Sequence, residues 1–170
     1  MNRNAANSAF PSPKHNHARC LKAALQGVRD ALKRHGQSMT PLREAIFRQI
    51  AASHRPIGAY EVREKLKANG RHLAPMSVYR IIEVFIEAGV VRRFETGNAF
   101  YASVRGDQFS PRIVLACRHC GCVADADGAA AFRAIGRIAH SHAFAPSGAV
   151  IEVLGACGHC AKKSAFTARP

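Results

Sequence analysis

Two cysteine pairs in the C-terminal third of the chain have the residue types and the spacing of metal ligands. Cys117 and Cys120 form one Cys-x-x-Cys pair, Cys157 and Cys160 form the other, and 36 residues separate the pairs. Two such pairs can place four thiolates at the corners of one tetrahedron, the geometry that a structural Zn²⁺ ion prefers. Soft thiolates also select zinc over hard cations such as Mg²⁺. We therefore predict one structural zinc ion per protomer.

Two other uses of these cysteines are less favoured but stay open at this point. Disulfides form in oxidising compartments, and nothing in the sequence marks the chain as secreted. A thioredoxin-like redox motif needs a single Cys-x-x-Cys, whereas this chain has two in matching form.

Several other candidate ligands lie outside the two pairs. His15, His17 and Cys20 are close enough in the chain to clamp a metal. They fall in or beside a polar N-terminal segment that we expect to be disordered, which favours the interpretation that they bind none. Cys20 and Cys122 are interpreted as small buried hydrophobic residues rather than redox sensors.

The composition indicates a protein of the cytoplasm. The 170 residues are 48% hydrophobic, enough for one domain or two small ones. No apolar run reaches the roughly 18 residues of a membrane span, and the N-terminus lacks the apolar segment of a signal peptide. We expect a cytoplasmic location and no membrane partner.

The positive charge is concentrated in the first part of the chain. The formal net charge is +14, and residues 1–105 hold 18 Lys and Arg against 7 Asp and Glu, whereas residues 106–170 hold 7 against 4. The first part therefore has the balance expected of a polyanion binder. A merely basic, soluble surface is the alternative, because charge alone gives affinity for phosphate without sequence specificity.

The elements that would position these residues can be read from the hydrophobic periodicity. After a disordered tail at 1–17, the pattern predicts a basic amphipathic helix over 18–34, a second helix opened by Thr40 and Pro41, a third over 59–68 and a fourth over 75–88. Strands at 90–95 and 98–103 flank a Thr-Gly turn and predict a hairpin. Three helices followed by a hairpin is the order of a winged helix-turn-helix, in which the fourth helix here would enter the major groove.

The C-terminal part is predicted to be a second, smaller domain. We place the winged-helix domain at 18–105, a hinge at 106–111, a zinc-binding dimerisation domain at 112–163 and a disordered tail at 164–170. We expect a strand at 113–116 that leads into the first cysteine pair, a helix at 129–142, and a strand at 150–154 that leads into the second pair. We expect Phe132, Ile135 and Ile138 to be buried on that helix. So small a unit buries little alone, which predicts stapling by zinc and homodimerisation. The fold class expected is α+β.

Several motifs, taken in their order along the chain, resemble the ferric uptake regulator (Fur) family. They are Met-Thr-Pro-Leu-Arg at 39–43, Gly-Ala-Tyr-Glu-Val at 58–62, Pro-Met-Ser-Val-Tyr-Arg at 75–80 and the paired cysteines. The Ala-Tyr at 59–60 and the Asn-Ala-Phe at 98–100 are similar to its zinc-uptake (Zur) branch. Each motif is modest alone, but their joint order is specific, and the similarity covers about residues 19–161.

The resemblance implies a homodimeric transcriptional repressor that binds an inverted-repeat operator in double-stranded DNA and controls metal homeostasis. Carried over to this sequence, the four paired cysteines fall on the family's structural zinc ligands. The implied DNA-contacting residues are Arg43, Tyr60, Ser77, Tyr79 and Arg80. Arg80 is the expected base reader, because arginine can donate two hydrogen bonds to guanine. Tyr60 and Tyr79 could instead be core aromatics.

Members of the family sense metal through a second, exchangeable metal site that lies between their domains. The sequence departs from the family at this site. In the zinc branch the corresponding positions here are Arg92, Ser103, Ser110 and Asp125. Arginine and serine are poor zinc ligands, so Asp125 alone survives. We expect the usual sensing site to be degenerate, and Arg92 could pair with Asp125 or Glu95 instead.

Two other function classes are weighed against the regulator. A zinc enzyme needs an open coordination position, and a four-cysteine shell leaves none. A zinc-ribbon module for RNA or protein binding is the stronger alternative, and it predicts binding that does not depend on DNA sequence.

Overall fold

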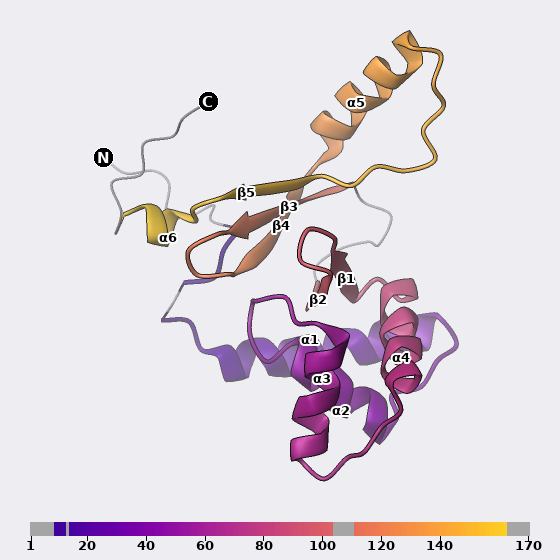
Figure 1. The fold of residues 1–170 in the computed structure, drawn as a ribbon, viewed down its shortest axis with the longest axis vertical. Helices are drawn as coiled ribbons and strands as arrows, with labels where there is room; N and C mark the ends of the chain where they lie inside the picture. Colours follow the sequence, from indigo (N-terminus) through magenta and orange to yellow (C-terminus); the bar gives the residue numbers. More distant parts are fainter. Residues whose placement is uncertain (1–8, 13, 104–110, 163–170) are drawn as a thin grey trace. The chain divides into compact units, whose positions relative to one another are not determined.

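The computed structural model describes residues 9–12, 14–103 and 111–162 (Figure 1). The chain divides into two compact units, Ser12–Gln108 and a second built mainly from Phe109–Pro170. The division falls inside the predicted hinge at 106–111. Ser110 and the tail at 164–170 lie outside the described residues.

The N-terminal unit contains four helices followed by a hairpin, in the order the sequence predicts. The bounds are α1 His17–Arg34, α2 Pro41–Ile50, α3 Ala59–Ala68, α4 Pro75–Glu87, β1 Val91–Phe94 and β2 Ala99–Ala102. Side chains fix two of the helix starts, since Asn16 accepts a hydrogen bond from the backbone N–H of Arg19 and Thr40 accepts one from that of Arg43. These caps satisfy donors that the first helical turn leaves unpaired. The helix boundaries predicted from the sequence for this unit agree with the observed ones to about one residue.

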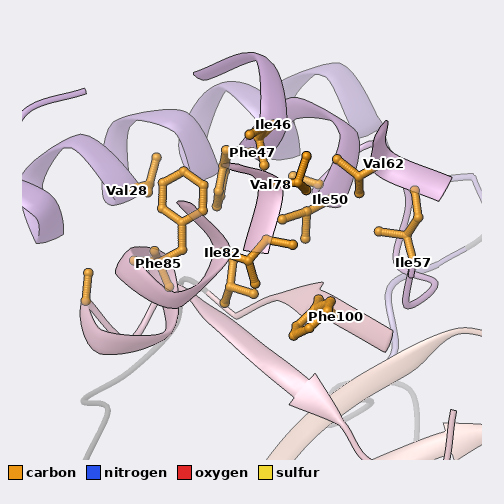
Figure 2. Close-up of a cluster of buried hydrophobic side chains, with 14 of the residues drawn as sticks. Val28, Ile46, Phe47, Ile50, Ile57, Val62, Val78, Ile82, Phe85 and Phe100 are labelled. Atoms are coloured by element: carbon orange, nitrogen blue, oxygen red, sulfur yellow. The ribbon is translucent and has the colours of Figure 1, made fainter. Parts of the chain in front are cut away.

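The helices enclose one hydrophobic core. Side chains from α1, α2, α3, α4 and both strands converge on it, as Figure 2 shows. Phe47 of α2 and Phe85 of α4 are fully buried and pack edge to face, with ring centroids 5.5 Å apart. Such aromatic pairs add stabilisation beyond the burial of their area. The core thus holds α4 in a fixed position against the other three helices.

The hairpin is tied to the helices through the loop between α2 and α3. Strands β1 and β2 are antiparallel, with Val91 opposite Ala102. Ile57, in that loop, donates to and accepts from the backbone of Phe100 at 2.8 and 2.9 Å. Two backbone hydrogen bonds at one residue pair extend the hairpin by a single bridge. Backbone hydrogen bonds therefore join the hairpin, which is the wing of the winged helix, to the loop before α3.

The C-terminal unit is a three-stranded sheet with two helices. Its elements are β3 Arg112–Cys117, β4 Val123–Asp127, α5 Ala129–Ser141, β5 Glu152–Gly155 and α6 Gly158–Ala161, and the strand order is β4-β3-β5. Strand β3 pairs antiparallel with β4 and parallel with β5. Strand β4 is absent from the elements predicted from the sequence, because its Val-Ala-Asp-Ala-Asp segment is short and half polar.

The expectation for the buried face of α5 is wrong. No residue of α5 is fully buried, Ile138 is 61% exposed, and Ile135 is 37% exposed. The helix extends away from the sheet (Figure 1). Periodicity identifies the apolar face of a helix but does not say whether the cover for that face comes from the same chain. Among the residues that the structure describes, none covers this face fully.

Replacing Phe85 with alanine tests the core. We expect Phe85→Ala to lower the free energy of unfolding of the N-terminal unit by about 3–5 kcal/mol, because it deletes a fully buried ring and leaves a cavity. Urea denaturation followed by circular dichroism measures the change. Tyr79→Ala on the exposed face of the same helix is the control and should change it by less than about 0.5 kcal/mol. Equal losses in the two variants would contradict the assignment of this core.

Candidate metal centre and nucleic-acid interface

Strand pairing brings the two cysteine pairs of the C-terminal unit together. Cys117 ends β3, and the parallel register places it opposite Gly155 of β5. Cys157 follows two residues later and caps α6, which carries Cys160. The backbone N–H of Cys157 also donates to the sulfur of Cys117 at 3.3 Å. Residues 40 positions apart in the chain thus meet at one end of the sheet.

The four sulfurs have the spacing of a tetrahedral zinc site. The ligand atoms of Cys117, Cys120, Cys157 and Cys160 all lie within 4.8 Å of one another, and the sulfurs of Cys120 and Cys157 are 3.9 Å apart. A Zn–S distance of about 2.3 Å puts the sulfurs of a regular tetrahedron about 3.8 Å apart. All six cysteines of the chain are free thiols in the structure. This arrangement fits a metal cluster and not the disulfide alternative.

The surroundings of the sulfurs favour a negative charge at Cys117. Burial raises the pKa of the Cys117 thiol, but hydrogen bonds from the backbone at Cys157, Cys120 and His119 outweigh burial and lower the pKa to about 6. Burial and hydrogen bonds with the other three sulfurs raise the pKa of Cys160 to about 12. Four packed thiols cannot all ionise without a cation among them. A divalent ion is the group that this cluster is suited to receive.

The predicted reading residues of α3 and α4 are exposed. Tyr60 is 67% exposed and Tyr79 is 42% exposed, so neither is a core aromatic. The guanidinium carbon of Arg63 lies 4.8 Å from the ring centroid of Tyr60, a cation–π contact. Arg80 is exposed and makes no hydrogen bond or ion pair with the part of the chain that the structure describes. Its five N–H donors are available to a ligand.

Ser77 and Arg43 are less accessible than Tyr60, Tyr79 and Arg80. Ser77 is half-buried in the first turn of α4. Arg43 is half-buried as well, and its guanidinium donates to the carbonyl of Ser38 and to the side chain of Gln37, the latter at 2.7 Å. These bonds brace the loop between α1 and α2. The structure thus gives Arg43 an internal role in addition to the DNA contact predicted for it.

Three of the four positions of the expected sensing site lie among the described residues, two in the N-terminal unit and one in the C-terminal unit. Arg92 lies half-buried on β1, and Ser103 is 7% exposed just after β2, with its N–H bonded to the carbonyl of Val90. Asp125 is half-buried on β4, opposite Val114. The suggested Arg92–Glu95 pair is not the one observed, because Glu95 pairs with Arg93 at 3.1 Å. The degeneracy of the site stays a prediction.

The structure brings together a second group of candidate ligands, at a place where the interpretation of the sequence favours no metal site. His15, His17 and Cys20 are joined by His54, and their ligand atoms lie within 4.8 Å of one another. His54 carries no motif that points to it, since it is 34 residues beyond Cys20 and lies in the loop after α2.

Among residues 9–12, 14–103 and 111–162, none of the helices combines the length and the apolar character that a membrane span requires.

Comparison with known proteins supports the resemblance. The family model described as "Ferric uptake regulator family" matches residues 34–154. The peroxide operon regulator of Bacillus subtilis is 28% identical over 84% of this chain and 94% of its own length. The zinc uptake regulation protein of Escherichia coli is 26% identical over 75% of each chain.

Two solved structures share the fold. The "Zinc Uptake Regulator Complexed With Zinc AND DNA" superposes with a TM-score of 0.72 at 22% identity, covering 90% of this chain and all of that chain. The "holo XcZur" structure superposes with a TM-score of 0.71 at 26% identity and covers 84% of this chain and 99% of that one. The α+β architecture of a winged helix followed by a small C-terminal domain is therefore confirmed, and a zinc-ribbon module is excluded. The chain belongs to the ferric uptake regulator family of transcriptional regulators, with the similarity extending to its zinc-uptake branch.

Proposed function

We propose that the chain is a cytoplasmic, homodimeric repressor of the zinc-uptake type that reads an inverted-repeat operator in genes of metal homeostasis. The observation that carries this proposal is the exposed face of α3 and α4, where Tyr60, Tyr79 and Arg80 project from helices that a buried core holds in place. A recognition helix enters the major groove with its N-terminal residues on the base edges. Arg80 then discriminates guanine through two hydrogen bonds, and the tyrosines supply further contacts.

The charge distribution supports a duplex as the partner. The N-terminal part has 18 Lys and Arg against 7 Asp and Glu. Several of its acidic side chains are already paired, since Glu44 bonds Arg29 at 2.8 Å and Arg48 at 2.7 Å. The hydrogen bonds to Arg48 and Arg29 lower the pKa of Glu44 and so stabilise its ionised carboxylate. The remaining basic side chains provide the phosphate affinity that sequence readout requires.

Dimerisation through the C-terminal unit fits its exposed apolar side chains. Four apolar side chains of this unit are between 48% and 67% exposed. They are Ile138 on α5, Phe144 and Val150 between α5 and β5, and Val153 on β5. Exposed apolar surface of this kind on a small unit marks an association site. A two-fold dimer would cover these side chains and present two winged helices to two half-sites.

The zinc ion that we assign to the four cysteines has a structural role. Zn²⁺ would be held by Cys117, Cys120, Cys157 and Cys160, one ion per protomer, in a closed shell with no position for water or substrate. The backbone N–H groups around Cys117 already favour its thiolate. Such an ion cross-links β3 to the end of β5, and a function as a zinc enzyme is not supported by this shell.

Replacing one of the cysteines tests this role. We expect Cys117→Ser to lose the ion of the cysteine cluster, unfold the C-terminal unit and abolish the dimer, because the free energy of metal binding is also folding free energy in so small a unit. Native mass spectrometry and size-exclusion chromatography measure these losses. Cys122→Ser is the matched control, since Cys122 lies outside the cluster. A folded Cys117→Ser dimer would refute the structural role.

Two substitutions separate base reading from phosphate contact. Arg80→Ala should remove discrimination at one base position, a loss of about 1–3 kcal/mol for the cognate base, because it deletes a bidentate contact. Lys22→Ala, at an exposed site on α1, should weaken all duplexes evenly and reduce the salt slope by about 1. Fluorescence anisotropy with the operator and with single-base variants at several salt concentrations distinguishes the two patterns. An even loss in Arg80→Ala would remove Arg80 from the reading role.

The degenerate sensing site predicts that its remaining acidic residue binds no ion. We expect Asp125→Ala to leave the number of zinc ions per protomer unchanged, because the other positions are Arg92, Ser103 and Ser110. Native mass spectrometry at matched free zinc counts the ions. A loss of one ion in this variant would show that a site uses Asp125 after all.

A further inference from the structure

The second ligand cluster joins two parts of the N-terminal unit that are distant in sequence. His17 begins α1, Cys20 lies one turn further along the same helix, and His15 precedes the helix start. His54 comes from the loop between α2 and α3. The four side chains are half-buried, and all belong to the unit Ser12–Gln108. The cluster therefore needs no contribution from the C-terminal unit.

The distances within the cluster are those of groups facing a common centre. The Nε2 atoms of His54 and His15 are 2.9 Å apart, and the Nε2 atom of His54 is 3.9 Å from the sulfur of Cys20. The ring centroids of the three histidines are separated by 4.8 to 5.6 Å. His17 and Cys20 share one helix face because they are three residues apart.

Backbone carbonyls set the protonation of two of these rings. The Nδ1 atom of His15 is 2.6 Å from the carbonyl oxygen of Ser12, and the Nε2 atom of His17 is 3.1 Å from that of Ala51. A carbonyl only accepts, so each of these nitrogens carries the proton. Nε2 of His15 and Nδ1 of His17 are then left with lone pairs. Metal-bound histidines are oriented in this way, with the second nitrogen donating to a carbonyl.

We propose that His15, His17, Cys20 and His54 form a second zinc site, distinct from the four-cysteine cluster and from the degenerate positions at Arg92 and Asp125. Three imidazoles and one thiolate suit Zn²⁺, which accepts both nitrogen and sulfur in a tetrahedron. Bonds of about 2.0–2.3 Å require ligand atoms about 3.3–3.6 Å apart. The observed 2.9 and 3.9 Å lie on either side of these values, and all four ligand atoms lie within 4.8 Å of one another, so binding an ion requires side-chain shifts but no rearrangement of the fold.

An ion at this place would fasten α1 to the loop that leads into α3. His54 is three residues before Ile57, whose backbone pairs with Phe100 of the wing. Gly58, the next residue, caps α3, which presents Tyr60. The ion would thus link α1, the wing and the start of α3 by bonds that the apo protein lacks. Four protein ligands leave no open position, so the site is not catalytic.

The simpler alternative is a packed group of histidines joined by an N–H···N bond between His15 and His54. Such a group and a zinc site differ in the number of ions that the protein holds. A metal count on the full chain decides between them, and it does not depend on whether the protein binds DNA.

The test compares single variants of the full-length protein by native mass spectrometry in buffered free Zn²⁺. We expect two zinc ions per wild-type protomer and one in His54→Ala and in Cys20→Ser. His35→Ala is the matched control, because His35 is an exposed histidine at the other end of α1, and it should keep two. Circular dichroism establishes that each variant is folded.

Cobalt substitution provides a second readout. Co²⁺ in the three-nitrogen, one-sulfur site should add visible absorption to that of the four-sulfur site, and His54→Ala should lose the added part only. One zinc ion per wild-type protomer would overturn the proposal. An unchanged count or an unchanged cobalt spectrum in folded His54→Ala would overturn it too.

Discussion

The C-terminal unit depends on the convergence of four sulfurs. Apart from Cys117 and Cys157, the buried hydrophobic side chains among residues 111–162 are small, namely Val114, Ala116, Val123 and Ala124. Burial of so little apolar area does not offset the conformational entropy of about 50 ordered residues. In our proposal, a metal ion bound by Cys117, Cys120, Cys157 and Cys160 would supply the missing cross-link between β3 and β5, and the partner protomer would supply the missing cover for α5.

The N-terminal unit is stabilised in a different way, and the difference suits its role. Large side chains such as Phe47, Leu32, Ile82 and Phe85 are fully buried between its helices. A close-packed core fixes the backbone of α4 without any ion. Exposed side chains on the opposite face, including Tyr79 and Arg80, are therefore presented on a rigid support. Readout of base edges needs that rigidity, since a displaced arginine loses its second hydrogen bond.

The candidate metal ligands of this chain gather in two clusters. Two positions of the sensing site that the family resemblance implies carry Arg92 and Ser103, which are poor zinc ligands. The two groups of thiol and imidazole ligands that the structure shows, among the residues it describes, each belong to a single unit. An ion bound by His15, His17, Cys20 and His54 would act directly on the loop that leads into α3 and that pairs with Phe100 of the hairpin.

The helices of the N-terminal unit and the chemistry of the cysteine pairs can be predicted from short stretches of sequence. Helix caps such as Thr40, the apolar periodicity of α4 and the Cys-x-x-Cys spacing are local signals, and they act over a few residues. The contacts between residues that are distant in the chain became visible in the three-dimensional structure. His54 joined His15, His17 and Cys20 across more than 30 residues, β4 formed on the edge of β3, and the apolar face of α5 was left open. These outcomes depend on packing between segments, and periodicity within one segment does not encode it.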